Sequence, residues 1–192
     1  MNSRTVLIVL GTLIVGIVLG YVIAPKMPGH MGMMGAQQGM GMQQNIDAHF
    51  IEQMIPHHEG AIDMAKVALE RSQRAEVRSL ANDIISAQTE EISQMQRWYQ
   101  DWFGKAPAAS GGHGMHMNGM SGDTGSLRTT SDFDREFVTQ MITHHEMAVM
   151  MAQMLQSSTD RPEMKQLASN IISSQTKEIE MMRGWLKEWG SQ

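Results

Sequence analysis

The spacing of apolar residues divides most of this 192-residue chain into four helical segments. Apolar side chains recur at intervals of three and four, which is the period of an amphipathic helix. The pattern predicts helices over about 47–71, 74–103, 132–157 and 161–189. The connection within each pair is very short, so the paired helices should be antiparallel neighbours. Because one hairpin cannot bury its apolar face alone, we expect an all-α, antiparallel four-helix bundle.

The predicted helix ends carry residues that suit them. Gly104 and Gly190 stand where helices usually stop. Ser131 and Asp160 are expected as amino-terminal caps, with Pro162 just inside the last helix.

The folded part is an internal duplication with an offset of 87 residues. Alignment of residues 47–102 with 134–189, without a gap, gives 25 identities in 56 positions. Both copies contain D-x-x-F-x-x-Q-M-I-x-H-H-E and, later, L-A-x-x-I-I-S-x-Q-T-x-E-I-x-x-M-x-x-W. Features of the first hairpin should therefore recur in the second.

The amino terminus differs from the rest. Residues 5–24 form a run of 20 residues without a charge, which is long enough to span a bilayer as a helix. Arg4 precedes the run and Lys26 follows it, so the flanking charges give little orientation signal. We expect a membrane anchor that leaves the bulk of the chain in the periplasm or extracellular space. The alternative is a secretory signal, after whose cleavage the chain would be secreted.

Two glycine-rich stretches without apolar periodicity predict flexible linkers. Six methionines and one histidine lie in residues 27–42, and three methionines and two histidines lie in residues 110–122. The whole chain then divides into an anchor or signal at 1–26, a linker at 27–45, a first hairpin at 46–104, a linker at 105–130 and a second hairpin at 131–192, with the two hairpins forming one domain.

Composition narrows the chemistry. The chain has 21 methionines, eight histidines and no cysteine, which excludes a disulfide, a thiolate metal site and a cysteine nucleophile. The net charge is −5 and no basic patch stands out, so nucleic acid is not expected as a partner. Methionine in a solvated linker gains nothing in packing, whereas thioethers and imidazoles are soft ligands that suit Cu(I). The alternative for the linkers is compositional drift.

Helical-wheel positions place polar residues inside the bundle. His58 points into the core, while His57 and Met64 fall on the edge of the apolar face. Glu91 falls in the middle of the second helix's apolar face, where a carboxylate needs a partner. We therefore expect a His58–Glu91 pair and, in the second copy, a His145–Glu178 pair. Two interpretations remain open, namely metal ligands backed by a carboxylate or a polar cluster that specifies the bundle.

The third predicted helix carries a row of soft ligands. His144, Met147 and Met151 share one flank beside the core face, at spacings of three and seven, and Met150 and Met154 lie next to them. This row is the stronger predicted copper site within the bundle. The full set of candidate ligands comprises histidines and methionines of both hairpins and of the second linker: His57, His58, Met54, Met64, His144, His145, Met141, Met147, Met150, Met151, Met154, His113, Met115, His116 and Met117.

The repeated motif resembles the domain of unknown function 305 family over about 140 residues. The resemblance implies a ferritin-like fold. The doubled arrangement with methionine-rich flanks resembles the CopM-type extracytoplasmic copper-binding proteins of that family, which implies copper binding and a role in copper resistance. The family's HH motif corresponds to His57-His58 and His144-His145, and its trailing methionine to Met64 and Met151.

The sequence thus predicts a copper-binding protein that sequesters or transfers copper, mainly Cu(I) with Cu(II) as the alternative. Its expected partners are copper ions, the membrane through the amino-terminal helix, and a copper-exporting or copper-accepting protein. A membrane-anchored helical interaction module without metal is a second hypothesis. A di-metal carboxylate enzyme is a third, although such sites need more inward glutamates than this chain offers. No nucleophile–base pair or phosphate loop is visible, so we do not expect an enzyme.

Overall fold

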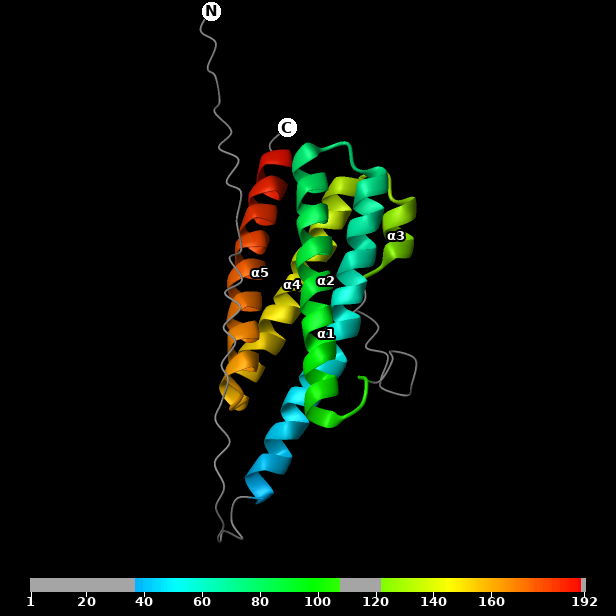
Figure 1. Cartoon of the computed structure of the whole chain (residues 1–192). Helices are drawn as coiled ribbons and strands as arrows, with labels where there is room; N and C mark the ends of the chain where they lie inside the picture. The colour runs from blue at the N-terminus through cyan, green and yellow to red at the C-terminus, as the bar shows by residue number, and fades with distance from the viewer. Residues whose placement is uncertain (1–36, 108–121, 191–192) are drawn as a thin grey trace, which may run out of the picture. The chain divides into compact units, whose positions relative to one another are not determined.

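The computed structural model describes residues 37–107 and 122–190 and confirms an all-α fold (Figure 1). Four long helices and one short helix make up this part of the chain. They are α1 (Gln37–Arg71), α2 (Ala75–Phe103), α3 (Thr124–Thr129), α4 (Phe133–Ser158) and α5 (Pro162–Trp189).

Several predictions concern residues outside the described ranges. These are the anchor or signal at 1–26, the first part of the linker at 27–45, and four candidate ligands, His113, Met115, His116 and Met117. Within residues 37–107 and 122–190, none of the helices combines the length and the apolar character that a membrane span requires.

The predicted boundaries of the long helices hold to within a residue or two, with one exception. Helix α1 begins at Gln37, ten residues before the predicted start, so residues 37–45 are helical instead of flexible linker. Glutamine and methionine, which supply most of this stretch, are good helix formers and need no apolar periodicity to continue a helix. Helix α3 was also not predicted, since it lies inside the linker expected at 105–130.

Two of the predicted amino-terminal caps are wrong by one residue. The caps of α4 and α5 are Asp132 and Arg161, each one residue after the predicted Ser131 and Asp160, and neither side chain makes a capping hydrogen bond. Pro162 explains the second shift, because a proline at the first helical position makes the preceding residue the cap. Gly104 ends α2 in the left-handed conformation, with φ of 69°, as a carboxyl-terminal glycine usually does.

Helix α1 packs against α2, and α4 packs against α5, so each repeat forms one hairpin. The two hairpins meet through α1 and α4, and α3 lies against both of these helices (Figure 1). The buried apolar residues form two clusters along the α1–α4 interface. The α3-side cluster includes Met64, Ala68, Leu127, Phe137 and Met141. The far cluster includes Phe50, Met54, Ala148, Ala152 and Leu155. Because the second half of α1 packs with the first half of α4, the two helices run antiparallel.

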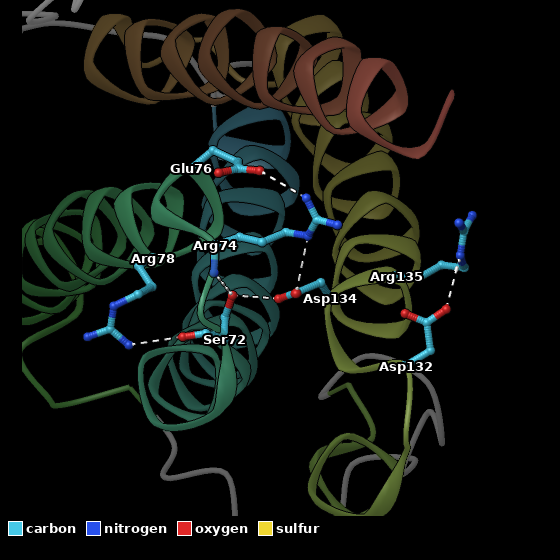
Figure 2. A network of polar contacts seen from close by, with 7 residues as sticks. All are labelled: Ser72, Arg74, Glu76, Arg78, Asp132, Asp134 and Arg135. Atoms are coloured by element: carbon cyan, nitrogen blue, oxygen red, sulfur yellow. Dashed lines mark hydrogen bonds and ion pairs between the residues drawn. The ribbon is translucent and has the colours of Figure 1, made fainter. Parts of the chain in front are cut away.

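The turn of each hairpin is tied to the start of the other hairpin. Figure 2 shows the first tie, in which Arg74 Nε lies 3.4 Å from Asp134 Oδ2 and the Ser72 hydroxyl donates to the same carboxylate. The guanidinium of Arg74 also lies 4.4 Å from the ring centroid of Trp189. The second tie repeats this arrangement 87 residues away.

In the second tie, Arg161 Nε donates to Asp47 Oδ2 at 3.0 Å, and its guanidinium lies 4.1 Å from the ring centroid of Trp102. These residues are the equivalents of Arg74, Asp134 and Trp189 by the offset of 87. The two ties hold the hairpins in one register and so fix which side chains meet at the centre of the α1–α4 interface.

Candidate metal site at the centre of the bundle

The centre of the α1–α4 interface is occupied by two histidines, one from each repeat. The ring centroids of His57 and His144 lie 3.6 Å apart with an angle of 40° between the planes. The residues are only 1% and 3% exposed. The prediction that both lie on the edge of the core is therefore wrong. Since α1 and α4 each contact three other helices, a wider arc of each helix is buried than a two-helix contact would bury.

Burial sets the protonation state of His57. Its pKa is lowered from 6.5 to about 2, first by desolvation and then by the nearby imidazoles of His144, His58 and His145. Neither ring nitrogen of His57 has a hydrogen-bond partner of good geometry. The backbone of His144 lies nearby and raises the pKa, which offsets part of the lowering. The imidazole of His57 is therefore neutral at any physiological pH.

The two inward histidine–glutamate pairs are present as predicted. His58 Nε2 lies 2.7 Å from Glu91 Oε2, and His145 Nε2 lies 2.6 Å from Glu178 Oε2. Both histidine side chains are fully buried, while the glutamate side chains keep about a fifth of their surface in water. Each pair thus links a buried imidazole to a carboxylate at the surface. The other ring nitrogen, Nδ1, of His58 and of His145 has no hydrogen-bond partner.

Methionines flank the central histidines on both sides along the interface. Met64 and Met141, one from each repeat, belong to the α3-side cluster. Met54 lies in the far cluster, and Met151 packs against that cluster. Each side therefore combines thioethers from both hairpins. Met54, Met64 and Met141 are fully buried, so the predicted edge position of Met64 is wrong.

The methionine row on α4 divides by exposure. Met150 and Met154 are 53% and 64% exposed, while Met147 and Met151 are half-buried. The predicted flank beside the core is confirmed for these four residues, but His144 is not part of it. The stronger site predicted for His144, Met147 and Met151 would therefore have its imidazole inside the bundle and its thioethers near the surface.

The donor set of this central region is soft. Imidazole nitrogens and thioether sulfurs suit Cu(I), whereas carboxylates prefer harder cations. Within residues 37–107 and 122–190, no group of three or more histidine, aspartate or glutamate side chains is arranged to hold a metal ion. A site here would thus combine histidine with methionine.

The central contact between His57 and His144 was missed from the sequence, although the signal was present. Both residues fall at equivalent positions of the repeat, and in an antiparallel pair of duplicated helices equivalent residues face each other at the centre. The contact between α3 and Met64 had no comparable signal, because Leu127 is an isolated apolar residue in a glycine-rich stretch.

Comparison with known proteins finds a family model and solved structures that match this architecture. The family model described as "Domain of unknown function (DUF305)" matches residues 47–186. The fold is similar to that of CopM in the Cu(II)-bound form, with 47% identity, a TM-score of 0.70, and coverage of 74% of this chain and 97% of that one. CopM in the Cu(I)-bound form is 45% identical, with a TM-score of 0.67 and coverage of 74% and 96%.

Two further relatives are less informative about chemistry. A DUF305 fragment from Deinococcus radiodurans is 35% identical, with a TM-score of 0.65 and coverage of 74% of this chain and 96% of that one. Uncharacterized protein L153 of Acanthamoeba polyphaga mimivirus is 42% identical over 55 residues, which are 29% of this chain and 36% of that protein. The match therefore spans about a third of that viral protein's length.

Proposed function

Because this chain belongs to the DUF305 family, we propose that it binds copper, mainly as Cu(I), through histidine and methionine side chains. It would sequester or transfer the ion and so contribute to copper resistance or homeostasis. Support comes from the similarity to CopM, whose structures include Cu(II)-, Cu(I)- and silver-bound forms. The proposed activity is binding and not catalysis.

The observation that carries the proposal is the buried pair of His57 and His144 between two sets of methionines. An unpartnered polar atom in a protein interior costs free energy, and both ring nitrogens of His57 are in that position. A Cu(I) ion would use such a nitrogen as a ligand. Thioethers on either side supply the further soft donors that Cu(I) accepts.

The electrostatics favour a monovalent soft cation. Metal binding requires a neutral imidazole, and desolvation already holds His57 in that form through its lowered pKa. Thioethers carry no proton at all, so protons would compete little with copper at this site. The surface carboxylates of Glu91 and Glu178, through His58 and His145, place negative charge near the added positive charge.

Competitive titration with a Cu(I) chelator tests the proposal, together with X-ray absorption that distinguishes sulfur from nitrogen ligands. Replacing both His57 and His144 by alanine should lower Cu(I) affinity by about 10-fold or more per lost ligand. His49→Ala is the matched control, because His49 lies on the same helix and is exposed. Circular dichroism confirms that each variant is folded. Unchanged affinity in the folded double variant, or a spectrum without sulfur and nitrogen ligands, rejects the central site.

We further propose that the chain is tethered to the membrane through residues 5–24 and that its helical domain lies in the periplasm or extracellular space. The support is the uncharged run of 20 residues near the amino terminus. A copper-exporting or copper-accepting protein in the same compartment would be its partner. Amino-terminal sequencing of the protein from its native membrane tests the tether, because a mature chain that begins near residue 25 would have lost it.

A further inference from the structure

We propose that α3 and Gly122 form a cover over the thioether of Met64, so that soft metal ions reach the folded domain through the methionines of α4. The metal-uptake half of this inference rests on the proposed copper binding. The cover itself does not, because it follows from packing alone. The two halves can therefore be tested separately.

Gly122 touches the sulfur of Met64 so closely that no other residue fits without a shift. A Cβ atom added at Gly122 would lie 2.2 Å from Met64 Sδ and 2.7 Å from its Cε. Gly122 also has a φ of +66°, a conformation that side chains other than glycine rarely adopt. Met64 is wholly buried. The thioether therefore lies directly under the backbone of the segment that leads into α3.

Polar contacts hold the cover to both hairpins. On the α1 side, the guanidinium of Arg71 donates to the carbonyl oxygens of Leu127 and Thr130, the latter at 2.9 Å, and Arg128 pairs with Glu70 at 3.0 Å.

On the α4 side, the backbone N–H of Asp123 donates to Gln140 Oε1 at 3.0 Å, and Gln140 Nε2 donates to the Ser126 hydroxyl at 2.8 Å. The side chain of Leu127 is fully buried in the α3-side cluster that also contains Met64. The cover is thus anchored by a buried leucine and by contacts on each side of it.

Among the residues that the structure describes, the equivalent position of the second repeat is more exposed. Met151 corresponds to Met64 but is half-buried, and its neighbours Met150 and Met154 are 53% and 64% exposed. The equivalents of these two on α1 are Asp63 and Val67, which are not thioethers. A soft cation arriving from solution can therefore meet sulfur on α4, while on α1 the equivalent sulfur is under the cover.

Methionine oxidation by hydrogen peroxide tests the cover without any metal. In this reaction the thioether sulfur takes one oxygen from the peroxide and water is released, at a rate that follows exposure. Peptide mass spectrometry on the full-length protein gives the rate at each methionine. We expect Met150 and Met154 to be oxidised at least about 10-fold faster than Met64. Equal rates for Met64 and Met150 in the unmodified protein overturn the cover.

Two substitutions identify the cause of the protection. Gly122→Ala should raise the oxidation rate of Met64 by about 10-fold, because the new Cβ forces the thioether or the covering segment out of its present position. Gly104→Ala is the matched control, since its φ is +69° but nothing lies within 4 Å of the added Cβ. Met54, which is buried in the far cluster, should stay slow in both variants and so reports on global unfolding. An equal effect of Gly104→Ala on Met64 contradicts the inference.

If Gly122→Ala unfolds the domain, Leu127→Ala serves as the second variant. It removes the buried side chain that anchors the cover, and it changes neither Gly122 nor Met64. It should expose Met64 by a similar factor and leave Met54 slow. A Met64 that stays protected in folded Leu127→Ala contradicts the inference.

Silver(I), a redox-stable soft cation, tests uptake at α4. One equivalent should slow the oxidation of Met150 and Met154 severalfold in the unmodified protein, since a sulfur bound to silver is no longer free to react. Silver binding in solution without protection of these two residues overturns uptake at α4. Absence of any silver or Cu(I) binding rejects the proposed function, while slow oxidation of Met64 that Gly122→Ala accelerates would still establish the cover.

Discussion

The two sides of the α1–α4 interface descend from the same repeat but differ in access. On the α3 side, Met64 is buried beneath Gly122. On the far side, its equivalent Met151 is half-buried beside exposed methionines. At the centre, between the two sides, both repeats keep a histidine, and His57 faces His144 there. The two halves therefore share their inner residues and differ in the exposure of the flanking methionines.

This difference separates two kinds of constraint. A buried imidazole or carboxylate must keep its partner, so both histidine–glutamate pairs survive with nearly equal distances of 2.7 and 2.6 Å. A residue on the flank of a helix has no such obligation. The flank of α1 has the exposed Asp63 where α4 has Met150, while Val67, the equivalent of the exposed Met154, is buried in the α3-side cluster. Ligand number can thus differ between the halves without any change in the fold.

Removing the anchor of α3 should have the largest effect on the covered side. Leu127→Ala should lower the free energy of unfolding by about 2–5 kcal/mol, as truncation of a buried leucine usually does, because Leu127 is fully buried in the α3-side cluster. Urea unfolding followed by circular dichroism measures the change. Met154→Ala on the open side is the control and should cost no more than about 0.5 kcal/mol. A cost below about 1 kcal/mol for Leu127→Ala would mean that α3 is not part of the cooperative unit.

Acid should disrupt both sides together, because His57 lies between them. The pKa of His57 is about 2 in the folded protein and near 6.5 in the unfolded chain, so the unfolded state takes up a proton first. Above pH 6.5, titration of His57 should not change the free energy of unfolding. Below that value the free energy of unfolding should fall by about 1.4 kcal/mol per pH unit as the pH drops toward 2. Unfolding free energies measured by urea titration between pH 7 and pH 4 test this slope.

His57→Leu should make the acid dependence shallower by about one proton per molecule, since leucine does not titrate. His49→Gln, which removes an exposed histidine from the same helix, is the matched control for the loss of one imidazole. If His57→Leu leaves the pH dependence of the parent unchanged, His57 is not the group that loses stability in acid.

The sequence predicted the fold and the polar pairs for a physical reason. Apolar periodicity and the repeat determine the four long helices, and a carboxylate such as Glu91 on an apolar face demands a partner within reach. The central histidines were misplaced because a helical wheel ranks positions around one helix and does not say how many neighbours that helix has. His57 falls just outside the apolar face of its own helix, but His144 of α4 packs against it and buries it.

The cover could not have been predicted in the same way. Helix α3 has six residues, too few to show a period, and its position depends on tertiary contacts of Arg71 and Gln140. The contact of Gly122 with Met64 depends on backbone conformation, which a glycine-rich stretch leaves open. Residues whose position is set by distant partners are thus the ones that the sequence pattern misses.

The inward pairs should respond equally on both sides, which sharpens the contrast with the flanks. Glu91→Ala and Glu178→Ala should each destabilise the protein by about 1–3 kcal/mol, because each leaves a buried imidazole without its partner. The two costs should agree to within about 0.5 kcal/mol, since the pairs have the same geometry and burial. Glutamine at either position keeps an acceptor oxygen and should recover most of the loss. Costs that differ by more than about 1 kcal/mol would contradict the equivalence of the two pairs.

The smallest effect on stability is expected on the open side of α4, where the effect on metal uptake should be clearest. Replacing Met150 and Met154 by leucine keeps the apolar volume and removes two exposed sulfurs, so the free energy of unfolding should change by no more than about 0.5 kcal/mol. Stopped-flow mixing with silver(I) should nevertheless show slower uptake, because two of the three methionines that are exposed in residues 46–107 and 122–190 are gone and only Met181 of α5 remains. The reciprocal change, Asp63→Met, adds an exposed thioether on α1 at the position equivalent to Met150, whereas Val67, the equivalent of Met154, is buried and is left unchanged. If access and not sulfur number limits uptake, that variant should gain little, because its added sulfur lies next to a Met64 that remains under Gly122. A variant of α1 that takes up silver as fast as the parent's α4 would show that exposed sulfur alone sets the rate, and the cover would then have no part in the difference between the two sides.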